Sequence, residues 1–538
     1  MVVDVIVDIL ASETDRIFEY YADDTVSAGD RVTVPFGGTT KDGVVMRVKE
    51  KPDFDAAKIK SVLGKLDEEP ALTKECLQLA EALSKAYFVS KASALRLFLP
   101  AEMRKGTVRE KFVKFAEYAA EDLDGALSAL RKTAVNQRAA LSFMSVQKKF
   151  RLSELNAKYG PASVNALKER GFIRVTEEKN VRRPYTAMEG AEKRVSLTFE
   201  QECAVRDIKE TDKKITLLHG VTGSGKTEVY LNLIKSVLDK GKTAVLLVPE
   251  ISLTPQMLKN LRGRFGDACA ILHSSLTPGE RFDEWWRLRT GEARIAVGAR
   301  SAVFAPLENL GLIVIDEEHD GSYQSESAPR YTTLEVAAFR AAYNGAKIVL
   351  GSATPSVETY KRAMEGEYNF TELKERVNKR PLPRVEIVDM RREVRRGNNT
   401  AFSSALKAEL AAVLEKKQQA IVFLNQRGYS KSVICTSCGY VPKCEACDVA
   451  LTYHMEEGAL KCHYCNAKYK MIEKCPECGS EYLRYGGAGT QRVVSELQKL
   501  FPAARILRMD RDTTQNKEGH FKICLLYTSP SPRDRSVS

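Results

Sequence analysis

The sequence predicts a multidomain α/β protein, and three observations lead to that prediction. At 538 residues the chain is too long for a single hydrophobic core, and its length suggests about three to five domains. From Leu197 onward, short apolar runs alternate with helical patterns, which is typical of a parallel sheet. Eight of the 12 cysteines fall between Cys435 and Cys478, which indicates a metal-binding segment rather than disulfides.

The composition is that of an ordinary soluble protein, with 43% hydrophobic and 29% charged residues. A net charge of +12 favours a polyanionic partner, and nucleic acid is the leading candidate. The sequence shows neither a signal-peptide pattern nor an apolar stretch long enough to span a bilayer, because Asp4 and Asp8 interrupt the apolar start. We therefore expect a cytoplasmic protein with no membrane partner, and one associated with the nucleoid if its polyanionic partner is DNA.

Residues 1–105 are expected to form a β-rich domain. Val3, Val5 and Val7 alternate with other residues, and the short alternating runs at 31–38 and 44–48 are divided by Gly and Asp-Gly turn signals. A helical spacing follows at 72–87. Nothing in this region specifies chemistry by itself.

A linker is expected at 106–131 and a winged-helix module at 132–180. The module is predicted because amphipathic helical patterns are followed by a short apolar run at 171–175. Winged helices bind DNA or other proteins, and the sequence leaves both open. The polar segment 181–196, broken by Pro184, is expected to be a second linker.

The region 197–375 is expected to contain the parallel sheet. Each predicted strand is a short continuous apolar run, as a strand covered on both faces should be. Polar sequence follows each run, which places functional loops at the carboxyl edge of the sheet. The predicted strands are 215–218, 244–248, 293–297, 312–315 and 348–350.

A phosphate-binding loop follows the first of these strands and precedes a helix expected at 228–238. Its glycines let backbone N–H groups close around a phosphate, and the helix N-terminus favours negative charge. Lys226 is expected to reach the β/γ-phosphates of ATP, and Thr227 to ligate Mg²⁺. The alternative is a glycine-rich turn without a ligand. The predicted ATP-binding residues here are Gly220, Val221, Thr222, Gly223, Ser224, Gly225, Lys226 and Thr227.

An acidic motif, Asp316-Glu317-Glu318-His319, follows the strand at 312–315. In P-loop nucleotidases one acid at this place holds Mg²⁺ and a second orients the attacking water. Asp316 suits the metal and Glu317 the water, and His319 completes the candidate catalytic set with Lys226. The alternative is a solvated acidic loop.

Other strand ends carry weaker signals. Arg300 and Ser301, and the segment 249–254, supply an arginine and hydroxyls that suit a DNA backbone, although ordinary loop chemistry would also explain them. Residues 351–355, Gly-Ser-Ala-Thr-Pro, could sense the nucleotide state or could only cap a helix.

Four Cys-x-x-Cys pairs form the second strong motif. Each pair supplies half of a zinc site, so the four pairs satisfy two tetrahedral sites that have no open position and are therefore structural. Iron–sulfur or redox chemistry is the alternative. His454 and His463 are expected to be surface residues rather than ligands. The predicted ligands are Cys435, Cys438, Cys444, Cys447, Cys462, Cys465, Cys475 and Cys478.

These motifs occur in the order found in the primosomal replication restart helicases, and from about Asp4 to Thr514 the chain resembles that family. The resemblance rests on GVTGSGKTEVY (220–230), VPEISLTPQ (248–256), DEEHD (316–320), GSATPS (351–356) and FLNQRGY (423–429). It implies an ATP-driven 3′-to-5′ DNA helicase of superfamily 2 that binds stalled or abandoned replication forks and begins primosome assembly. The implied domains are a RecA-like helicase lobe 1 (197–375), the start of lobe 2 (376–432), a two-zinc Cys-rich insertion (433–482) and a partial lobe 2 (483–518).

The resemblance also implies roles that the residue patterns do not. Phe18, Glu19, Gly37 and Lys60 match a pocket for the 3′ end of DNA, with Glu19 where an Asp is usual. Gln201 matches an adenine-reading glutamine, and 320–331 matches an aromatic-rich loop that couples DNA contact to hydrolysis. The implied zinc sets are nested, with the outer pairs (Cys435, Cys438, Cys475, Cys478) in one site and the inner pairs (Cys444, Cys447, Cys462, Cys465) in the other.

The implied cofactors are ATP, Mg²⁺ and two Zn²⁺. The implied partners are forked DNA, single-stranded DNA, single-strand-binding protein and other primosome proteins. An alternative of a different class is a non-hydrolysing platform that binds DNA and docks the primosome. A third interpretation, another superfamily 2 translocase, is disfavoured by the four cysteine pairs.

The sequence also departs from the family. Gln491 replaces a common Glu, and neither a Gln-Met-Lys-Gly loop nor the arginine-finger motif Gln-Val-Ala-Gly-Arg-Ala-Gly-Arg occurs. The tail 519–538 looks like foreign sequence, and we expect it to be disordered. We therefore expect a C-terminally truncated relative whose ATP hydrolysis and unwinding are impaired.

Overall fold

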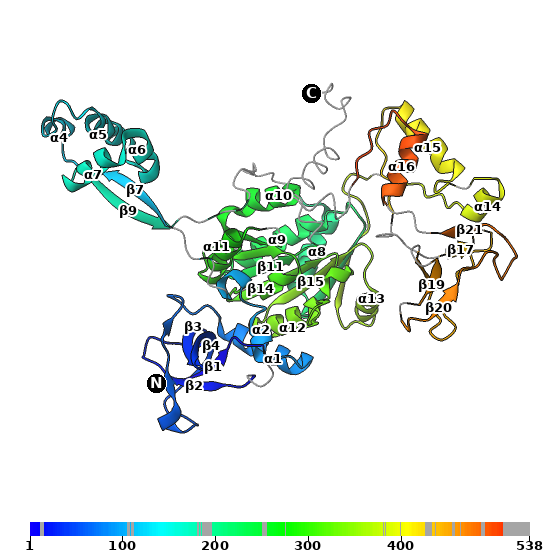
Figure 1. Cartoon of the computed structure of the whole chain (residues 1–538), viewed down its shortest axis with the longest axis horizontal. Coiled ribbons are helices and arrows are strands. Elements are labelled where there is room, and N and C mark those ends of the chain that lie inside the picture. The colour runs from blue at the N-terminus through cyan, green and yellow to red at the C-terminus, as the bar shows by residue number, and fades with distance from the viewer. Residues whose placement is uncertain are drawn as a thin grey trace. The chain divides into compact units, whose positions relative to one another are not determined.

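The computed structural model (Figure 1) describes most of the chain and divides it into two compact units, residues 1–380 and 381–538. The described residues are 1–10, 15–104, 108, 112–179, 182, 184, 196–249, 255–274, 276–379, 381, 383–398, 400–424, 433–435, 437–454, 458–462, 464–485 and 490–508. The predicted tail 519–538, most of the segment 423–429 and most of the strand-end segment 249–254 lie outside them. Among the described residues, no helix combines the length and apolarity that crossing a membrane requires.

The N-terminal β-domain is a six-stranded sheet in the order β5-β2-β1-β4-β3-β6. Its central strand β1 is buried along its whole length because both faces are covered. Val3, Val5 and Val7 pack into one apolar cluster, while Ile6 packs into another with the helices that follow. The strands are β1 (Val2–Val7), β2 (Phe18–Tyr21), β3 (Arg31–Phe36), β4 (Thr39–Lys49), β5 (Lys60–Ser61) and β6 (Gly64–Lys65), with a 3₁₀ turn at Ala56–Lys58.

Three helices join this sheet to the next large domain: α1 (Lys74–Tyr87), α2 (Lys91–Leu95) and α3 (Ala101–Arg104). Thr73 caps α1 by accepting a hydrogen bond from the Cys76 backbone N–H. One continuous apolar cluster contains residues of these helices and of the parallel sheet. Trp285 Nε1 also donates to the Phe98 carbonyl oxygen at 2.9 Å. The N-terminal region and the parallel sheet therefore share a core.

A small α/β unit follows, whose described residues form a three-stranded sheet in the order β8-β7-β9 and four helices. The expected linker at 106–131 is wrong over 112–131. Strand β7 pairs with β9 along its full length, and Ala116, Ala126 and Leu130 lie in the core of this unit. The elements are β7 (Phe112–Tyr118), α4 (Leu123–Ser128), α5 (Val135–Gln147), β8 (Lys149–Arg151), α6 (Leu152–Tyr159), α7 (Pro161–Glu169) and β9 (Ile173–Lys179).

The predicted parallel sheet has seven strands in the order β12-β13-β11-β14-β15-β10-β16 (Figure 1, green). Alternate residues of each central strand face opposite sides. Val245 and Ile313 join the cluster with α11 (Pro278–Arg289) and α12 (Thr333–Asn344). Leu246 and Val314 join the cluster with α8 (Phe199–Glu210) and α9 (Lys226–Leu238). Two strands were not predicted, β12 and β16, and these form the two edges. The strands are β10 (Ile215–Gly220), β11 (Thr243–Leu247), β12 (Cys269–Leu272), β13 (Ile295–Gly298), β14 (Leu310–Asp316), β15 (Lys347–Ser352) and β16 (Asn369–Leu373).

The helices around this sheet begin where the sequence supplies caps. Thr198 and Gln201 form a capping box at α8, and Thr277 and Glu280 form another at α11. The helices are α8 (Phe199–Glu210), α9 (Lys226–Leu238), α10 (Pro255–Phe265), α11 (Pro278–Arg289), α12 (Thr333–Asn344) and α13 (Val357–Met364), with 3₁₀ turns at Gly266–Ala268, Arg300–Phe304 and Gly321–Tyr323.

The second unit contains three helices and two small antiparallel sheets within its described residues. Phe402, Val493 and Leu497 form a small apolar cluster between helices distant in sequence. The helices are α14 (Met390–Arg395), α15 (Ser404–Glu415) and α16 (Thr490–Leu500). The strands are β17 (Val433–Cys435) paired with β21 (Leu483–Tyr485), and β18 (Thr452–His454), β19 (Ala459–Lys461) and β20 (Lys468–Lys470).

Candidate nucleotide and zinc sites

The phosphate loop joins the end of β10 to the start of α9. Gly223 and Gly225 have φ angles of +84° and +80°, a backbone conformation that favours glycine. Lys226 is buried, and its Nζ donates to the Gly220 carbonyl oxygen at 2.9 Å. Ser224 is also buried, and its Oγ has no hydrogen-bond partner among the described residues. Within this loop, Lys226 is therefore bonded to the loop's own backbone, and Ser224 keeps an unused buried hydroxyl.

Gln201 lies against this loop. Its Oε1 accepts from the Thr198 backbone N–H at 2.9 Å, and its Nε2 donates to the Ser224 carbonyl oxygen at 2.9 Å. A Cβ atom placed on Gly225 would lie 2.3 Å from Nε2. The amide is thus fixed beside the phosphate loop, with both polar atoms bonded to the protein.

The acidic motif lies at the end of β14, and β15 separates it from β10. Tyr230 on α9 donates from Oη to Asp316 Oδ1 at 2.9 Å, and Tyr323 Oη donates to the Asp316 carbonyl oxygen at 2.7 Å. Burial raises the pKa of Asp316, and the charge of Glu317 acts in the same direction, while Tyr230 and Lys226 oppose them. Burial also raises the pKa of Tyr230 well above its usual value. The carboxylate therefore sits where a cation would be favourable.

The rest of the acidic motif contacts the end of β15. His319 Nδ1 lies 2.8 Å from Ser352 Oγ, and its Nε2 lies 3.4 Å from Thr354 Oγ1. Glu318 accepts a hydrogen bond from the Ser356 backbone N–H at 2.7 Å, and Ser356 is the N-cap of α13. The segment 351–356 is thus both a helix cap and a contact surface of the acidic motif.

Arg300 and Ser301 follow β13. Arg300 donates to the Ser322 carbonyl oxygen at 3.2 Å and to the Gln324 carbonyl oxygen, and its guanidinium carbon lies 5.7 Å from the centroid of the Tyr331 ring. The arginine is therefore bonded to the segment 320–331. Ser301 is exposed.

The four residues matched to a DNA 3′-end pocket lie in neighbouring parts of the β-domain. The ring of Phe18 packs edge-on against Phe36, which precedes Gly37, and β2 pairs with β5 at Lys60. Glu19 is different, because its carboxylate accepts from Lys49 Nζ at 2.5 Å and from the backbone N–H groups of Asp53 and Phe54 at 3.0 Å each. Its hydrogen bonds therefore go to the end of β4 and to the β4–β5 connection.

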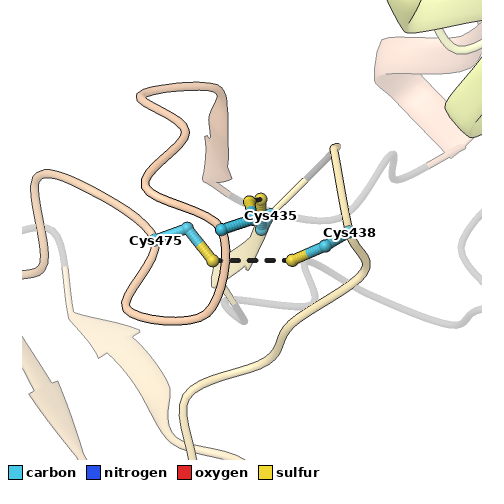
Figure 2. A group of neighbouring side chains, drawn as sticks. Cys435, Cys438 and Cys475 are labelled. Atoms are coloured by element: carbon cyan, nitrogen blue, oxygen red, sulfur yellow. Dashed lines mark hydrogen bonds between the residues drawn. The ribbon is translucent and has the colours of Figure 1, made fainter.

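The eight clustered cysteines form two groups of four, and in each group the Sγ atoms lie within 4.8 Å of one another. The grouping is the nested one that the resemblance implies. Figure 2 shows part of the outer group, in which Cys438 Sγ and Cys475 Sγ are 3.5 Å apart. His463 and the side chain of His454 lie outside the described residues. The groups are Cys435, Cys438, Cys475 and Cys478, and Cys444, Cys447, Cys462 and Cys465.

All four cysteine pairs share one turn. The residue after the second cysteine has a positive φ, and its N–H donates to the carbonyl oxygen of the first cysteine. Such turns direct both thiols of a pair to the same side. Glycine, Asn and Asp tolerate this conformation, so their occurrence after every pair is a signal that the sequence analysis did not use. The residues are Gly439, Asp448, Asn466 and Gly479.

One thiol in each group has a pKa that favours the thiolate. Burial raises the pKa of Cys435, but the backbone N–H groups of Cys438 and Ser437 outweigh it and lower the pKa to about 6. The Tyr469 hydroxyl lowers the pKa of Cys444 to about 6. Four thiols at this spacing suit tetrahedral Zn²⁺.

Three family models match the chain. A 3′DNA-binding domain (3′BD) model matches residues 4–100, a DEAD/DEAH box helicase model matches 198–363, and a model of the PriA DNA helicase Cys-rich region (CRR) matches 444–470. Replication restart protein PriA of Bacillus subtilis is 40% identical, over 97% of this chain and 74% of that protein. The chain belongs to the PriA family of replication restart proteins.

Other PriA proteins match similarly. The Haemophilus influenzae protein is 34% identical over 94% of this chain and 70% of its own length. The Synechocystis protein is 43% identical over 67% of this chain and 44% of its own length. The predictions of a helicase domain, a DNA-binding domain and a zinc-type Cys-rich region are confirmed by these matches. The sequence analysis gave no role to Tyr230 or Glu318, because the hydrogen-bond partner of each lies on another strand or helix.

Proposed function

We propose that this member of the PriA family is an ATP-driven 3′-to-5′ DNA helicase that recognises stalled replication forks and starts primosome assembly. The observation that carries the proposal is that Lys226 and Asp316 lie near each other at the carboxyl ends of the parallel strands. The same chain also has a 3′DNA-binding domain. Ligands of such sheets bind beyond the carboxyl ends of the strands.

The phosphate loop would hold the triphosphate of ATP. Backbone N–H groups of 220–227 and Lys226 Nζ would contact the phosphates, and Gln201 would lie beside the adenine. Thr227 and Asp316 would hold Mg²⁺, which neutralises charge on the phosphates. The donor set fits this ion, because a hydroxyl and a buried carboxylate are oxygen ligands. Glu317 would orient the attacking water, and His319 would fix the acidic motif against Ser352.

Two Zn²⁺ ions would be held by the two cysteine groups. Each group offers four thiols and therefore leaves no position for a substrate. The ions would then stabilise a segment whose strands are only three residues long. This supports a structural rather than a catalytic role.

DNA would contact several parts of the chain. Phe18, Gly37 and Lys60 would bind the 3′ end, whereas Glu19 would support the neighbouring loop through its bonds to Asp53 and Phe54. Ser301 is exposed for a backbone phosphate. Arg300 would act through the segment 320–331. The proposed protein partners are single-strand-binding protein and other primosome proteins.

The variant Lys226→Ala tests the proposal. We expect at least a roughly hundredfold loss of ATP hydrolysis stimulated by single-stranded DNA, because a positioned cation stabilises the transferring phosphate. Fork binding, measured by fluorescence anisotropy, should stay within about twofold. Lys235→Ala is the matched control, since Lys235 is exposed on the same helix.

Polarity is measured on partial duplexes with a 3′ or a 5′ single-stranded tail. Unwinding of the 3′-tailed duplex but not of the 5′-tailed one, abolished by Lys226→Ala, supports a 3′-to-5′ motor, and unwinding of the 5′-tailed duplex alone contradicts this polarity. If Lys226→Ala changes neither fork binding nor ATP turnover, the non-hydrolysing platform is the better interpretation.

A further inference from the structure

Tyr230 lies one helical turn after Lys226 on α9. Residues four apart share a helix face, so the helix that presents Lys226 to the phosphate loop also presents Tyr230 to the sheet. Tyr230 is completely buried, and its Oη donates to Asp316 Oδ1 at 2.9 Å. A residue of the first motif therefore orients the carboxylate of the second.

Gly351 leaves room for the Tyr230 phenol because it has no side chain. Strand β15 lies between β10 and β14, and Gly351 is in register with Asp316. A Cβ atom on Gly351 would lie 1.6 Å from Tyr230 Oη and 3.3 Å from Asp316 Oδ1. Any side chain here would displace the phenol, which explains a glycine at the start of Gly-Ser-Ala-Thr-Pro. Three separate segments thus converge on one carboxylate oxygen.

We propose that Tyr230 is a positioning residue for the metal-binding carboxylate of Asp316, and that Gly351, because it has no side chain, leaves room for the Tyr230 phenol. The proposal rests on the proposed function, which makes Asp316 a ligand of Mg²⁺. Carboxylates that bind metals are themselves held by hydrogen bonds, and loss of such a partner typically costs about 10- to 100-fold in metal affinity or activity. Tyr230 would thus act on the metal and not on the base or sugar of ATP.

The test is Tyr230→Phe in the full chain without DNA. The readout is binding of a fluorescent nonhydrolysable ATP analogue, titrated with Mg²⁺ and compared with binding in EDTA. We expect the Mg²⁺ half-saturation concentration to rise about 10- to 100-fold, while analogue affinity in EDTA stays within about twofold. ATP hydrolysis by the same variant should recover at high Mg²⁺.

Tyr323→Phe is the matched control. It also removes a buried phenol hydroxyl that bonds Asp316, but this hydroxyl bonds the main-chain oxygen. We expect a comparable loss of thermal stability without the rise in Mg²⁺ half-saturation. Gly351→Ala is the second variant, since it moves the phenol without removing it, and it should raise Mg²⁺ half-saturation as Tyr230→Phe does.

An unchanged Mg²⁺ half-saturation in Tyr230→Phe overturns the inference and leaves the proposed function standing. The inference is also overturned if Tyr230→Phe and Gly351→Ala each lower the affinity for the ATP analogue equally with and without Mg²⁺. The phenol would then support the phosphate loop and not the metal site. If the unaltered chain shows no Mg²⁺-dependent binding at all, the proposed function itself fails.

Discussion

The buried ion pair between Glu75 and Arg340 joins the N-terminal helices to the parallel-sheet domain. Arg340 is 2% exposed, and its Nε donates to Glu75 Oε1 at 2.6 Å. The rest of its guanidinium donates to three carbonyl oxygens at 2.8 to 3.1 Å, those of Val303, Ala305 and Leu307. We expect Glu75→Gln to lower the free energy of unfolding, because it leaves the buried guanidinium without a counter-charge.

The expected loss is about 3 kcal/mol, at the lower end of the roughly 3–5 kcal/mol typical for breaking a buried pair, since glutamine keeps the volume and one acceptor. Such a loss lowers the unfolding temperature by roughly 6–12 °C for a cooperative unit of about 150–250 residues. Scanning calorimetry of the full chain measures both quantities. The matched control is Glu365→Gln, which breaks an exposed pair with Lys361 and should cost less than about 1 kcal/mol.

The double variant Glu75→Leu, Arg340→Met separates charge from hydrogen bonding. Removing both charges ends the unpaired-charge penalty, but the three carbonyl oxygens lose their donor, so the double variant should remain less stable than the unaltered chain. A cost below about 1 kcal/mol for Glu75→Gln would refute the reasoning, because the carbonyl oxygens alone would then suffice for Arg340.

Three further predictions concern the metal groups, the pH dependence and the phosphate loop. Cys447→Ser should reduce the zinc content by one ion per chain in metal analysis, because one of the two four-cysteine groups loses a ligand. The pKa of Glu393 is lowered from 4.5 to about 2, chiefly by the hydrogen bond from the Ser404 hydroxyl. The ionised carboxylate therefore stabilises the folded state fully above about pH 4.5, and this stabilisation is lost as the pH falls to about 2. Glu393→Gln should make the unfolding temperature depend less on pH over that range. Gly225→Ala places a Cβ atom 2.3 Å from Gln201 Nε2 at a φ of +80°, and should weaken binding of an ATP analogue at least about fivefold in a fluorescence titration.

The central strands of the parallel sheet were predictable because each carries its own signal. A strand covered on both faces needs a continuous apolar run, and β11 and β14 have one. The missed strands β12 and β16 are the two edges of the sheet. β16 reads Asn-Phe-Thr-Glu-Leu and has no continuous apolar run. β12 is a continuous apolar run of four residues, as long as the predicted β13, so its sequence carried a signal that the prediction missed.

Partners distant in sequence explain the other differences. Strand β7 reads Phe-Val-Lys-Phe-Ala-Glu-Tyr, without strict alternation, because Lys114 and Glu117 are three residues apart. Its pairing with β9 is set by residues about sixty positions away. Tyr230 resembles any apolar helix position until Asp316, 86 residues later, is placed beside it. The phosphate loop and cysteine pairs, by contrast, hold their chemistry in contiguous residues and could be predicted.

Glu317 shows how the acidic motif depends on its neighbours. Its φ of +48° is a left-handed conformation that costs a non-glycine residue roughly 1–2 kcal/mol. The residues after it offset that cost, since Glu318 accepts hydrogen bonds from Ser356 at the start of α13 and His319 contacts Ser352. The segment 351–356 therefore holds the two residues that follow Glu317 in the acidic motif. A shift of α13 that moved Ser356 away from Glu318 would break these hydrogen bonds, and the residue next to Glu317 would lose that support.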